Sequence, residues 1–484
     1  MAGKNINGFE RLLKGVRVLA IVCNQWGDTG KGKFSDFFSA HWADVIARGT
    51  GGNNAGHTII MNGKEKIFHL LPAGIVYDKV GKISVLGNGM VIDLKVLLQE
   101  MQELDEEGLS YKNLMISKDA YVIMPYHIFR DKKKNASQDK GGVGSTGRGI
   151  GPCYTDKIAR RGICIGDLYD EELLRDKLNK VKEFYPEQRI DVEFLIERLK
   201  PYYEKIKPYV RDTVNEMHRF LKQGKKILLE GAQGLLLSIE HGTYPYVTSS
   251  DCSVNGTANG VGLSASDVDL TLGVIKFPFM TRVGAGPFPT ELGNSVSEKY
   301  CAKGLEHDIK YELSKYGIPF SEEKGRVIYN RDYEIIHKLM KSEDEFEKGV
   351  GIRLAAGEYG ATTKRPRRVG WTDGVAAKYA VGINGMNFVL TKADCLNGEG
   401  TFKVCYGYKK GKEVFTDFNK DGNFLRSVEP IYKEYSAYGK IKGVYDFKKL
   451  PASLKQAIKD FERFTGGEVV ALSNGPEKDK LIVK

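Results

Sequence analysis

Glycine clusters that follow short apolar runs are the feature that most limits how this chain can fold. The chain has 484 residues, of which 56 are glycine. Apolar runs suited to buried strands occupy residues 17–23, 82–86, 226–229, 270–277 and 385–390. Glycine is favoured where the backbone takes a positive φ or lies close to a ligand. We therefore interpret the clusters as loops of a binding site, since flexible linkers are richer in serine and have few apolar neighbours.

Helical patterns alternate with these apolar runs. Residues 94–104 place leucine and methionine side chains along one helical face. Residues 191–224 read as two or three helices because Pro201 and Pro208 interrupt the pattern. The alternation predicts an α/β fold with a large, mostly parallel central sheet and flanking helices. Ligands of such folds bind beyond the carboxyl ends of the strands, where the glycine loops would lie.

Composition excludes several classes of protein. Lys and Arg number 73 against 62 Asp and Glu, giving a net charge of +11, and 41% of the residues are hydrophobic. These values are ordinary for a folded protein, and no apolar run approaches the ~18 residues of a membrane span. The seven cysteines lack CxxC spacing, and the N-terminus lacks a secretory pattern, so we expect a reducing, cytoplasmic location. The sequence lacks a basic stripe interleaved with aromatic residues, so we expect no nucleic-acid partner.

The segment GDTGKGK at residues 27–33 fits the GxxxxGK pattern of a phosphate-binding loop. It follows a predicted strand and precedes a helix-like segment at 34–42, so backbone N–H groups would face phosphate oxygens. Lys31 or Lys33 would add positive charge. Phe34 stands where magnesium-binding loops place Ser or Thr, which makes Asp28 the candidate metal ligand. A solvated turn is the alternative.

Two further loops carry side chains suited to proton transfer and to guanine recognition. His57 lies in a loop of small residues, and histidine is the side chain most easily used as a proton donor near neutral pH. Taken alone, it is more often a structural residue. The segment TKAD at residues 391–394 follows an apolar run and matches the pattern with which many GTP-binding proteins read guanine. The Asp394 carboxylate would accept from guanine N1–H and the 2-amino group; a surface Lys/Asp pair is the alternative.

A third candidate segment is rich in arginine and contains Arg365, Arg367 and Arg368. Arginine suits bidentate recognition of phosphate and carboxylate groups. A solvated basic face is the alternative interpretation of such a run.

In this order along the chain, the motifs resemble those of the adenylosuccinate synthetase family. The segments that carry the resemblance are QWGDTGKGK (25–33), NAGHT (54–58), STGRGIGP (145–152), DKIARRG (156–162), EGAQG (230–234), HGTYPYVTSS (241–250), RVGAGPFPTE (282–291) and GATT (360–363). The resemblance runs from about residue 17 to the C-terminus.

The resemblance implies a P-loop-like ligase of AMP synthesis that depends on magnesium and GTP. A base would remove the N1 proton of inosine monophosphate (IMP), and O6 would attack the γ-phosphate of GTP. The amino group of L-aspartate would then displace phosphate from C6, giving adenylosuccinate, GDP and phosphate. Phosphorylation is required because the oxygen at C6 is otherwise a poor leaving group.

The resemblance also assigns residues to roles. It implies Asp28 as general base and magnesium ligand, His57 as acid, Lys31 and Gln233 as further catalytic residues, and the Gly56 carbonyl as a second magnesium ligand. For GTP it implies Gly27, Gly30, Lys31, Gly32, Lys33, Gly56, His57, Thr58, Arg367, Lys392, Asp394, Ser473 and Gly475. For IMP it implies Asp28, Asn54, Ala55, Thr146, Arg160, Gln233, Thr248 and Arg365, with Arg160 reaching the partner's active site in a homodimer. For aspartate it implies Thr362, Thr363, Arg365 and Arg367.

Because motifs from both ends of the chain would converge on one site, we predict a single domain over residues 1–484. Residues 294–357 are rich in charged residues and tyrosine, and we interpret them as a surface insertion atypical of the family, with a helix at 333–346. Residues 401–484 read as short strands with one helix near 454–464. The insertion leads directly into the predicted aspartate loop.

Individual positions also depart from the family pattern. Thr29 stands where the family usually has Glu, and Asn53 where it often has His. In the aspartate loop, Lys364 and Pro366 stand where Gly and Arg are usual. We expect these changes to affect binding of the second substrate and motion of the loop more than phosphoryl transfer.

Two other functions remain open from the sequence. A related ligase could aminate a guanine nucleotide, but phage-type relatives of that kind lack an acid at the position of Asp28, which this chain retains. A GTP-binding regulatory module would need neither a second phosphate-binding pocket nor a base at that position.

Overall fold

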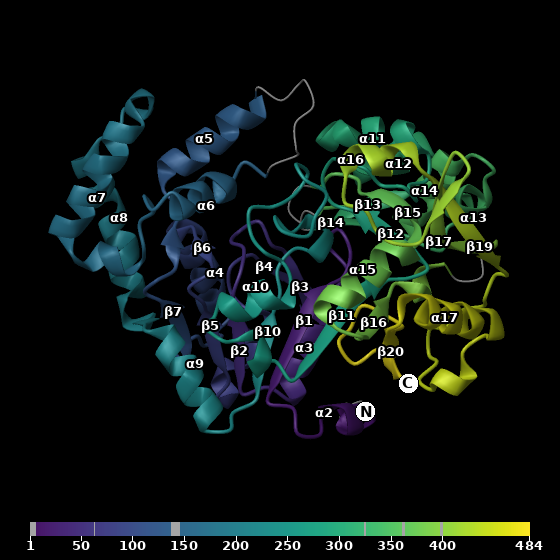
Figure 1. Ribbon diagram of the computed structural model, residues 1–484, viewed down its shortest axis with the longest axis horizontal. Coiled ribbons are helices and arrows are strands. Elements are labelled where there is room, and N and C mark those ends of the chain that lie inside the picture. The colour runs from purple at the N-terminus through teal and green to yellow at the C-terminus, as the bar shows by residue number, and fades with distance from the viewer. Residues whose placement is uncertain (1–5, 62, 137–145, 324–325, 361–363, 397–399) are drawn as a thin grey trace.

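The computed structural model describes residues 6–61, 63–136, 146–323, 326–360, 364–396 and 400–484. Within these residues, ten strands form one large sheet through the middle of the molecule (Figure 1). In order across the sheet, the strands are β21 (Leu481–Val483), β20 (Glu468–Ser473), β16 (Asn387–Thr391), β11 (Leu270–Lys276), β1 (Val18–Cys23), β10 (Ile227–Glu230), β2 (Val45–Arg48), β5 (Ile83–Leu86), β7 (Leu114–Ser117) and β9 (Val210–Arg211).

The large sheet is mostly parallel, as the sequence predicts. Among the described strands, every neighbouring pair is parallel except β20 and β21. All six residues of β1 are buried, which explains why this strand is a continuous apolar run with no polar alternation. Because parallel strands share one direction, the loops that follow β1, β10, β11, β16 and β20 leave the same edge of the sheet.

Helices surround this sheet (Figure 1). The α-helices outside residues 294–357 are α2 (Glu10–Leu13), α3 (Lys31–His41), α4 (Leu94–Glu106), α5 (Pro125–Ala136), α6 (Ile150–Ile158), α7 (Glu171–Phe184), α8 (Val192–Ile206), α9 (Thr213–Lys222), α10 (Val254–Asn259), α15 (Gly374–Asn384), α16 (Gly422–Ser427) and α17 (Ala452–Thr465). Helix α4 begins after Asp93, whose side chain accepts from two backbone N–H groups, and it buries the predicted apolar face. No helix in the described part of the chain has the length and apolar character needed to span a membrane.

Residues 191–224 form two α-helices, within the predicted two or three, but the predicted interruption at Pro201 is wrong. Helix α8 continues through Pro201 and buries Leu195, Leu199 and Tyr203 along one face. The packing of that face offsets the single backbone hydrogen bond that proline cannot donate. Pro208 lies in a short 3₁₀ turn that ends this helical stretch.

A second sheet has five strands within the described residues. They are β12 (Phe279–Arg282), β15 (Arg368–Asp373), β17 (Phe402–Lys410), β18 (Glu413–Phe415) and β19 (Glu429–Tyr435). Residues 401–484 contain two α-helices, α16 and α17, where the sequence predicts one; Asp421 caps the additional helix by accepting from Phe424 N. Elsewhere in the described residues, β3 (His57–Met61) pairs with β4 (Lys64–Phe68), and β6 (Val91–Ile92) pairs with β8 (Tyr121–Val122).

Residues 294–357 are partly built into the core, so their description as a surface insertion is incomplete. Their elements are α11 (Asn294–Ala302), α12 (Ile309–Lys315), β13 (Phe320–Glu323), β14 (Arg326–Tyr329), α13 (Glu334–Lys341) and α14 (Glu345–Ala356). Leu313, Ile336 and Val350 belong to the same buried cluster as Phe277 and Trp371. That this segment is atypical of the family, and that the chain is one domain, stay predictions.

The predicted helix at 333–346 is two helices. Helix α13 ends at Lys341, and the Asp344 side chain accepts from Phe346 N and Glu347 N to start α14. An aspartate at this position satisfies backbone donors that a continuous helix would otherwise bond internally.

Candidate active site

The predicted phosphate-binding loop joins β1 to α3 through left-handed backbone positions. Gly27, Asp28 and Gly30 have φ values of 83°, 52° and 87°. Gly32, in the first turn of α3, lies against β3: a Cβ there would be 2.7 Å from the carbonyl oxygen of Thr58. Glycine at this position therefore lets the helix N-terminus, with its free N–H groups, approach the strand that begins at His57.

His57 is oriented by a buried carboxylate. Its Nδ1 is hydrogen-bonded to Oε1 of Glu230, at the end of β10, and Glu230 Oε2 accepts from Ala73 N at 3.0 Å. Burial lowers the pKa of His57, so the ring is neutral near pH 7. Burial opposes ionisation of Glu230, but His57 and Arg48 together hold the pKa of Glu230 below its usual value. Nδ1–H therefore donates to Glu230, and Nε2 is left to exchange a proton with a ligand.

Asp28 is paired with a cation from the arginine-rich loop. Arg367 Nη2 forms an ion pair with Asp28 Oδ2, and Arg367 Nη1 donates to Oε2 of Glu358 at 3.0 Å. Glu358 also accepts from Lys276 Nζ at 2.5 Å and lies 3.6 Å from Lys392 Nζ. Burial alone would raise the pKa of Glu358, but these three cations hold it well below its usual value. One ionised carboxylate thus joins the ends of β11 and β16 to the arginine-rich loop.

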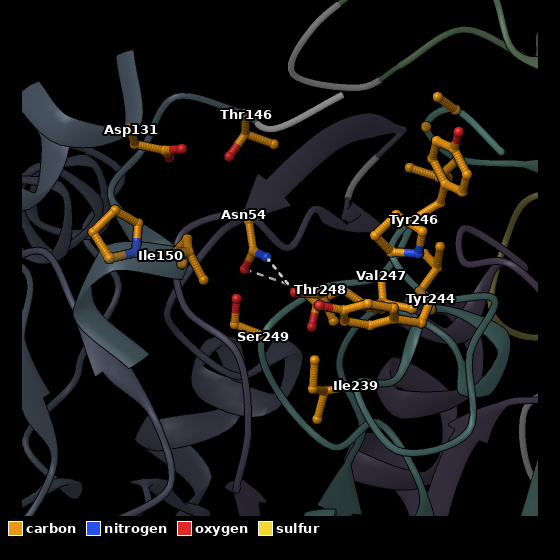
Figure 2. Close-up of a pocket in the computed structure, with 18 of the residues that line it drawn as sticks. Asn54, Asp131, Thr146, Ile150, Ile239, Tyr244, Tyr246, Val247, Thr248 and Ser249 are labelled. Carbon is orange, nitrogen blue, oxygen red and sulfur yellow. Dashed lines mark hydrogen bonds between the residues drawn. The ribbon is translucent and has the colours of Figure 1, made fainter. Parts of the chain in front are cut away.

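A pocket of about 490 Å³ opens beside this network. Four predicted IMP residues line it, namely Asn54, Thr146, Gln233 and Thr248. Asn54 Oδ1 accepts from Gln233 Nε2 at 3.0 Å, and Asn54 Nδ2 donates to Thr248 Oγ1 at 3.5 Å (Figure 2). Tyr244 and Tyr246 lie on one side of these polar groups, and Asp131 and Ile150 on the other. Apolar walls around a few converging polar groups are typical of a small-molecule site.

The predicted phosphate loop packs against two residues that line this pocket. A Cβ at Gly27 would lie 3.1 Å from Leu237 and 3.4 Å from Val283, and both residues line the pocket. Lys31 Nζ donates to the backbone carbonyl of Gln233 at 2.5 Å. The candidate nucleotide phosphates and the pocket ligand would therefore share one boundary.

Two of the predicted guanine residues, Ser473 and Gly475, contact Lys33, whereas the Lys392 side chain donates to the carbonyl of Ala356 at 2.8 Å. Lys33 Nζ donates to Ser473 Oγ at 2.6 Å and to the carbonyls of Gly475 and Lys480 at 2.7 and 2.6 Å. Burial lowers the pKa of Lys33 to about 7, although Asp394 acts in the opposite direction. Burial raises the pKa of Asp394. Lys33 thus links the phosphate loop to the guanine loop through its side chain.

Some predicted residues lie outside this convergence. Arg365 is exposed and does not line the pocket; its side chain lies against Gly304, where a Cβ would be 3.0 Å from Arg365 Nε. Arg160 is exposed beyond the end of α6, as a residue that reaches a partner subunit would be. Thr362 and Thr363 lie outside the described residues.

The sequence analysis missed three buried charged residues. Glu230 and Lys276 each close an otherwise apolar strand, and a charged residue at the last position of a buried strand is a usable signal for a site residue. Glu358 directly precedes the glycine-containing loop but carries no comparable pattern. Its importance depends on the three cations around it, which are distant in sequence.

Comparison with known proteins identifies the fold and the family. A family model described as adenylosuccinate synthetase matches residues 20–482. The chain belongs to the adenylosuccinate synthetase family. The family's member from Thermoanaerobacter sp. (strain X514) is 39% identical over 475 residues, covering 96% of this chain and 98% of that protein. The member from Halothermothrix orenii is 38% identical over 472 residues, covering 96% and 97%.

Solved structures agree with the predicted fold class. The fully ligated adenylosuccinate synthetase from Plasmodium falciparum has a TM-score of 0.79 at 33% identity, covering 97% of this chain and all of that chain (100%). The cyanophage S-2L succinoaminodeoxyadenylate synthetase, bound to dGMP and dATP, has a TM-score of 0.53 at 19% identity, covering 97% and 95%. The second similarity concerns the fold alone.

We predict that Glu230→Gln lowers kcat by ~10²-fold or more with little change in the substrate KM values. An amide cannot stabilise a positive charge on His57, and a positioned acid contributes typically ~10²–10⁴-fold. Steady-state kinetics with a thermal-melting control checks this, with the exposed Glu240→Gln as the matched variant. An unchanged kcat in folded Glu230→Gln would exclude a proton-transfer role for this pair.

We also predict that burial of Lys33 makes the free energy of unfolding depend on pH. The unfolded chain keeps this lysine protonated up to ~10.4, whereas its folded pKa is about 7. Between these values the unfolded state binds more protons, so the free energy of unfolding rises with pH, by at most ~1.4 kcal/mol per pH unit. Denaturant titrations should show this rise in the wild type relative to Lys33→Met, and not relative to the exposed Lys412→Met. Parallel pH curves for wild type and Lys33→Met would contradict it.

Proposed function

We propose that this chain joins IMP and L-aspartate at the expense of GTP, giving adenylosuccinate, GDP and phosphate at the carboxyl edge of the central sheet. The observation that carries the proposal is that Asp28 lies in a phosphate-binding loop directly behind a pocket lined by Asn54, Gln233 and Thr248. A GTP-binding regulatory module needs one nucleotide site, whereas a pocket beside a predicted phosphate loop supports a reaction between two ligands. Membership of the family supports the same reaction.

The first step combines removal of a proton from IMP with transfer of a phosphoryl group to IMP. Asp28 removes the N1 proton of IMP, and O6 takes the γ-phosphoryl group of GTP. Once Nε2 of His57 carries a proton, the positively charged ring, paired with Glu230 through Nδ1, stabilises the oxygen on which charge develops. Lys31 holds the backbone of Gln233 at the pocket wall. The residues that bind the purine are therefore fixed relative to the phosphate loop.

GTP occupies the phosphate loop and the loops that follow β16 and β20. The phosphates of GTP contact backbone groups of Gly27, Gly30, Gly32, Gly56 and Thr58. Lys392, Asp394, Ser473 and Gly475 surround the guanine, and the Asp394 carboxylate accepts from N1–H and the 2-amino group. Adenine lacks these two donors, so this pairing selects GTP over ATP.

Magnesium fits the residues present. The described residues contain no cluster of three or more His, Cys, Asp or Glu side chains able to hold a metal, so phosphate oxygens would complete the coordination. Asp28 and the Gly56 carbonyl would hold the ion, since Mg²⁺ prefers such oxygen ligands. Bound there, it supplies charge that favours phosphoryl transfer.

The second step needs the arginine-rich loop. Thr362, Thr363, Arg365 and Arg367 bind the carboxylates of aspartate, and the amino group then displaces phosphate from C6. Arg365 also contacts IMP, so it moves from its position beside Gly304. Ala55 and Thr146 complete the IMP site, and Arg160 of a second copy reaches the IMP phosphate in a homodimer. Seven free thiols support a cytoplasmic location for this assembly.

The reaction is tested by mixing the protein with IMP, GTP, magnesium and aspartate and following the absorbance of adenylosuccinate. We expect product with the wild type and a loss of at least ~10²-fold in Asp28→Ala, because the general base is removed. A wild type no more active than Asp28→Ala would exclude the proposal. A preference for deoxyguanosine monophosphate over IMP would favour the guanine-aminating alternative.

We predict that Thr248→Val raises the KM for IMP by roughly tenfold while the KM for GTP stays within twofold. Thr248 is bonded to Asn54 in the pocket, and a hydrogen bond to a charged ligand contributes about 1.5–3 kcal/mol. Steady-state kinetics with each substrate varied in turn measures the difference. Equal changes in both KM values would place Thr248 outside the IMP site.

A further inference from the structure

A second buried carboxylate, Glu312, connects residues 294–357 to the arginine-rich loop. Glu312 lies in α12, and its side chain has no exposed surface (0%). It accepts from Arg353 Nε at 3.1 Å, from Arg353 Nη2 at 2.7 Å and from the hydroxyl group of Tyr359. Arg353 lies near the end of α14 and is itself buried. Both partners of the ion pair therefore come from this segment.

The same ion pair reaches both ends of the loop. Tyr359 stands at the start of the loop and bonds Glu312 directly. Arg367 stands at its end, and its backbone carbonyl accepts from Arg353 Nη1 at 2.7 Å. The loop is closed at its base because Arg367 N donates to the carbonyl of Glu358 at 3.0 Å and Gly360 N to that of Arg365 at 2.8 Å. The Glu312 carboxylate thus holds both ends of the arginine-rich loop, at Tyr359 directly and at Arg367 through Arg353.

The position of Arg353 decides where the Arg367 guanidinium points. Arg367 is held at its carbonyl by Arg353 and at its side chain by Glu358 and Asp28. A shift of the backbone carbonyl would move the guanidinium relative to the phosphate loop. A buried ion pair adds little net stability compared with apolar side chains of the same size, but it fixes the direction of every hydrogen bond that it makes.

We propose that Glu312 is a positioning residue for the aspartate-binding step: through Arg353 and Tyr359 it sets the spacing and orientation of the loop that carries Arg365 and Arg367. This inference rests on the proposed role of that loop in binding aspartate and GTP. It assigns to residues 294–357 a function in catalysis, namely to support the substrate loop from outside the phosphate site.

The test compares Glu312→Gln and Tyr359→Phe with the wild type in steady-state kinetics, using the full chain. Tyr359→Phe removes the bond from the loop to Glu312 and leaves the buried ion pair intact, so it remains informative if Glu312→Gln does not fold. We expect the KM for aspartate to rise at least fivefold in Glu312→Gln and at least threefold in Tyr359→Phe. The KM for IMP should change less than the KM for aspartate, since Arg365 is the one proposed IMP residue on this loop, whereas Asn54, Gln233 and Thr248 line the pocket away from it.

The matched control is Glu322→Gln, which makes the same chemical change at an exposed residue of the same segment, paired with Lys310 at 2.6 Å. We expect wild-type kinetics from this variant. If Glu312→Gln and Tyr359→Phe lower the melting temperature but leave the KM for aspartate unchanged, the role of Glu312 is structural and the inference is wrong.

A third variant separates this inference from the proposed function. Arg365→Ala should raise the KM for aspartate if the loop binds that substrate. If it does so and the Glu312 and Tyr359 variants do not, only the positioning role fails. If Arg365→Ala has no effect on the KM for aspartate, the loop assignment fails, and the inference fails with it.

Discussion

The buried charge of Glu358 is the constraint on which the geometry of the site depends. Only 1% of its side chain is exposed, and an ionised carboxylate in such a place is costly unless cations surround it. Lys276, Arg367 and Lys392 supply those cations from three separate segments. Each of the three cations would lose a buried carboxylate partner if it moved away. The ends of β11 and β16 and the arginine-rich loop are therefore held together before any ligand binds.

This arrangement explains how a site for anionic substrates can exist as a folded structure. Arg367 has two carboxylate partners, and only Asp28 is partly exposed, with 33% of its side chain accessible. An incoming phosphate or carboxylate can replace Asp28 as a partner of Arg367 while Glu358 keeps the guanidinium in place. Under the proposed mechanism, this exchange would free Asp28 to act as the base. Positioned cations lower the cost of reorganisation on binding.

The parts of the site that sequence could predict are those encoded locally. The glycines at 27, 30 and 32 follow an apolar strand, and the TKAD segment follows another, so the strand–loop context that the sequence predicts is confirmed for both loops, while their ligands stay predictions. The roles of Glu358 and Glu312 could not be found this way, because their partners are many residues away in sequence and become neighbours only on folding. The same reason explains the error at Pro201: the penalty is local, whereas the packing that offsets it is tertiary.

Lys364 shows how the loop tolerates its departure from the family pattern. The family resemblance leads us to expect glycine there, and Lys364 adopts a φ of 53°, the left-handed conformation that glycine takes without strain. For a residue with a Cβ this conformation costs roughly 1–2 kcal/mol. Lys364 N donates to the carbonyl of Gly360 at 2.8 Å, and the hydrogen bonds at the loop base hold the two strands at the spacing that this turn requires. The loop therefore keeps a glycine-like path without glycine because buried ion pairs on either side, at Glu312 and Glu358, prevent its ends from relaxing.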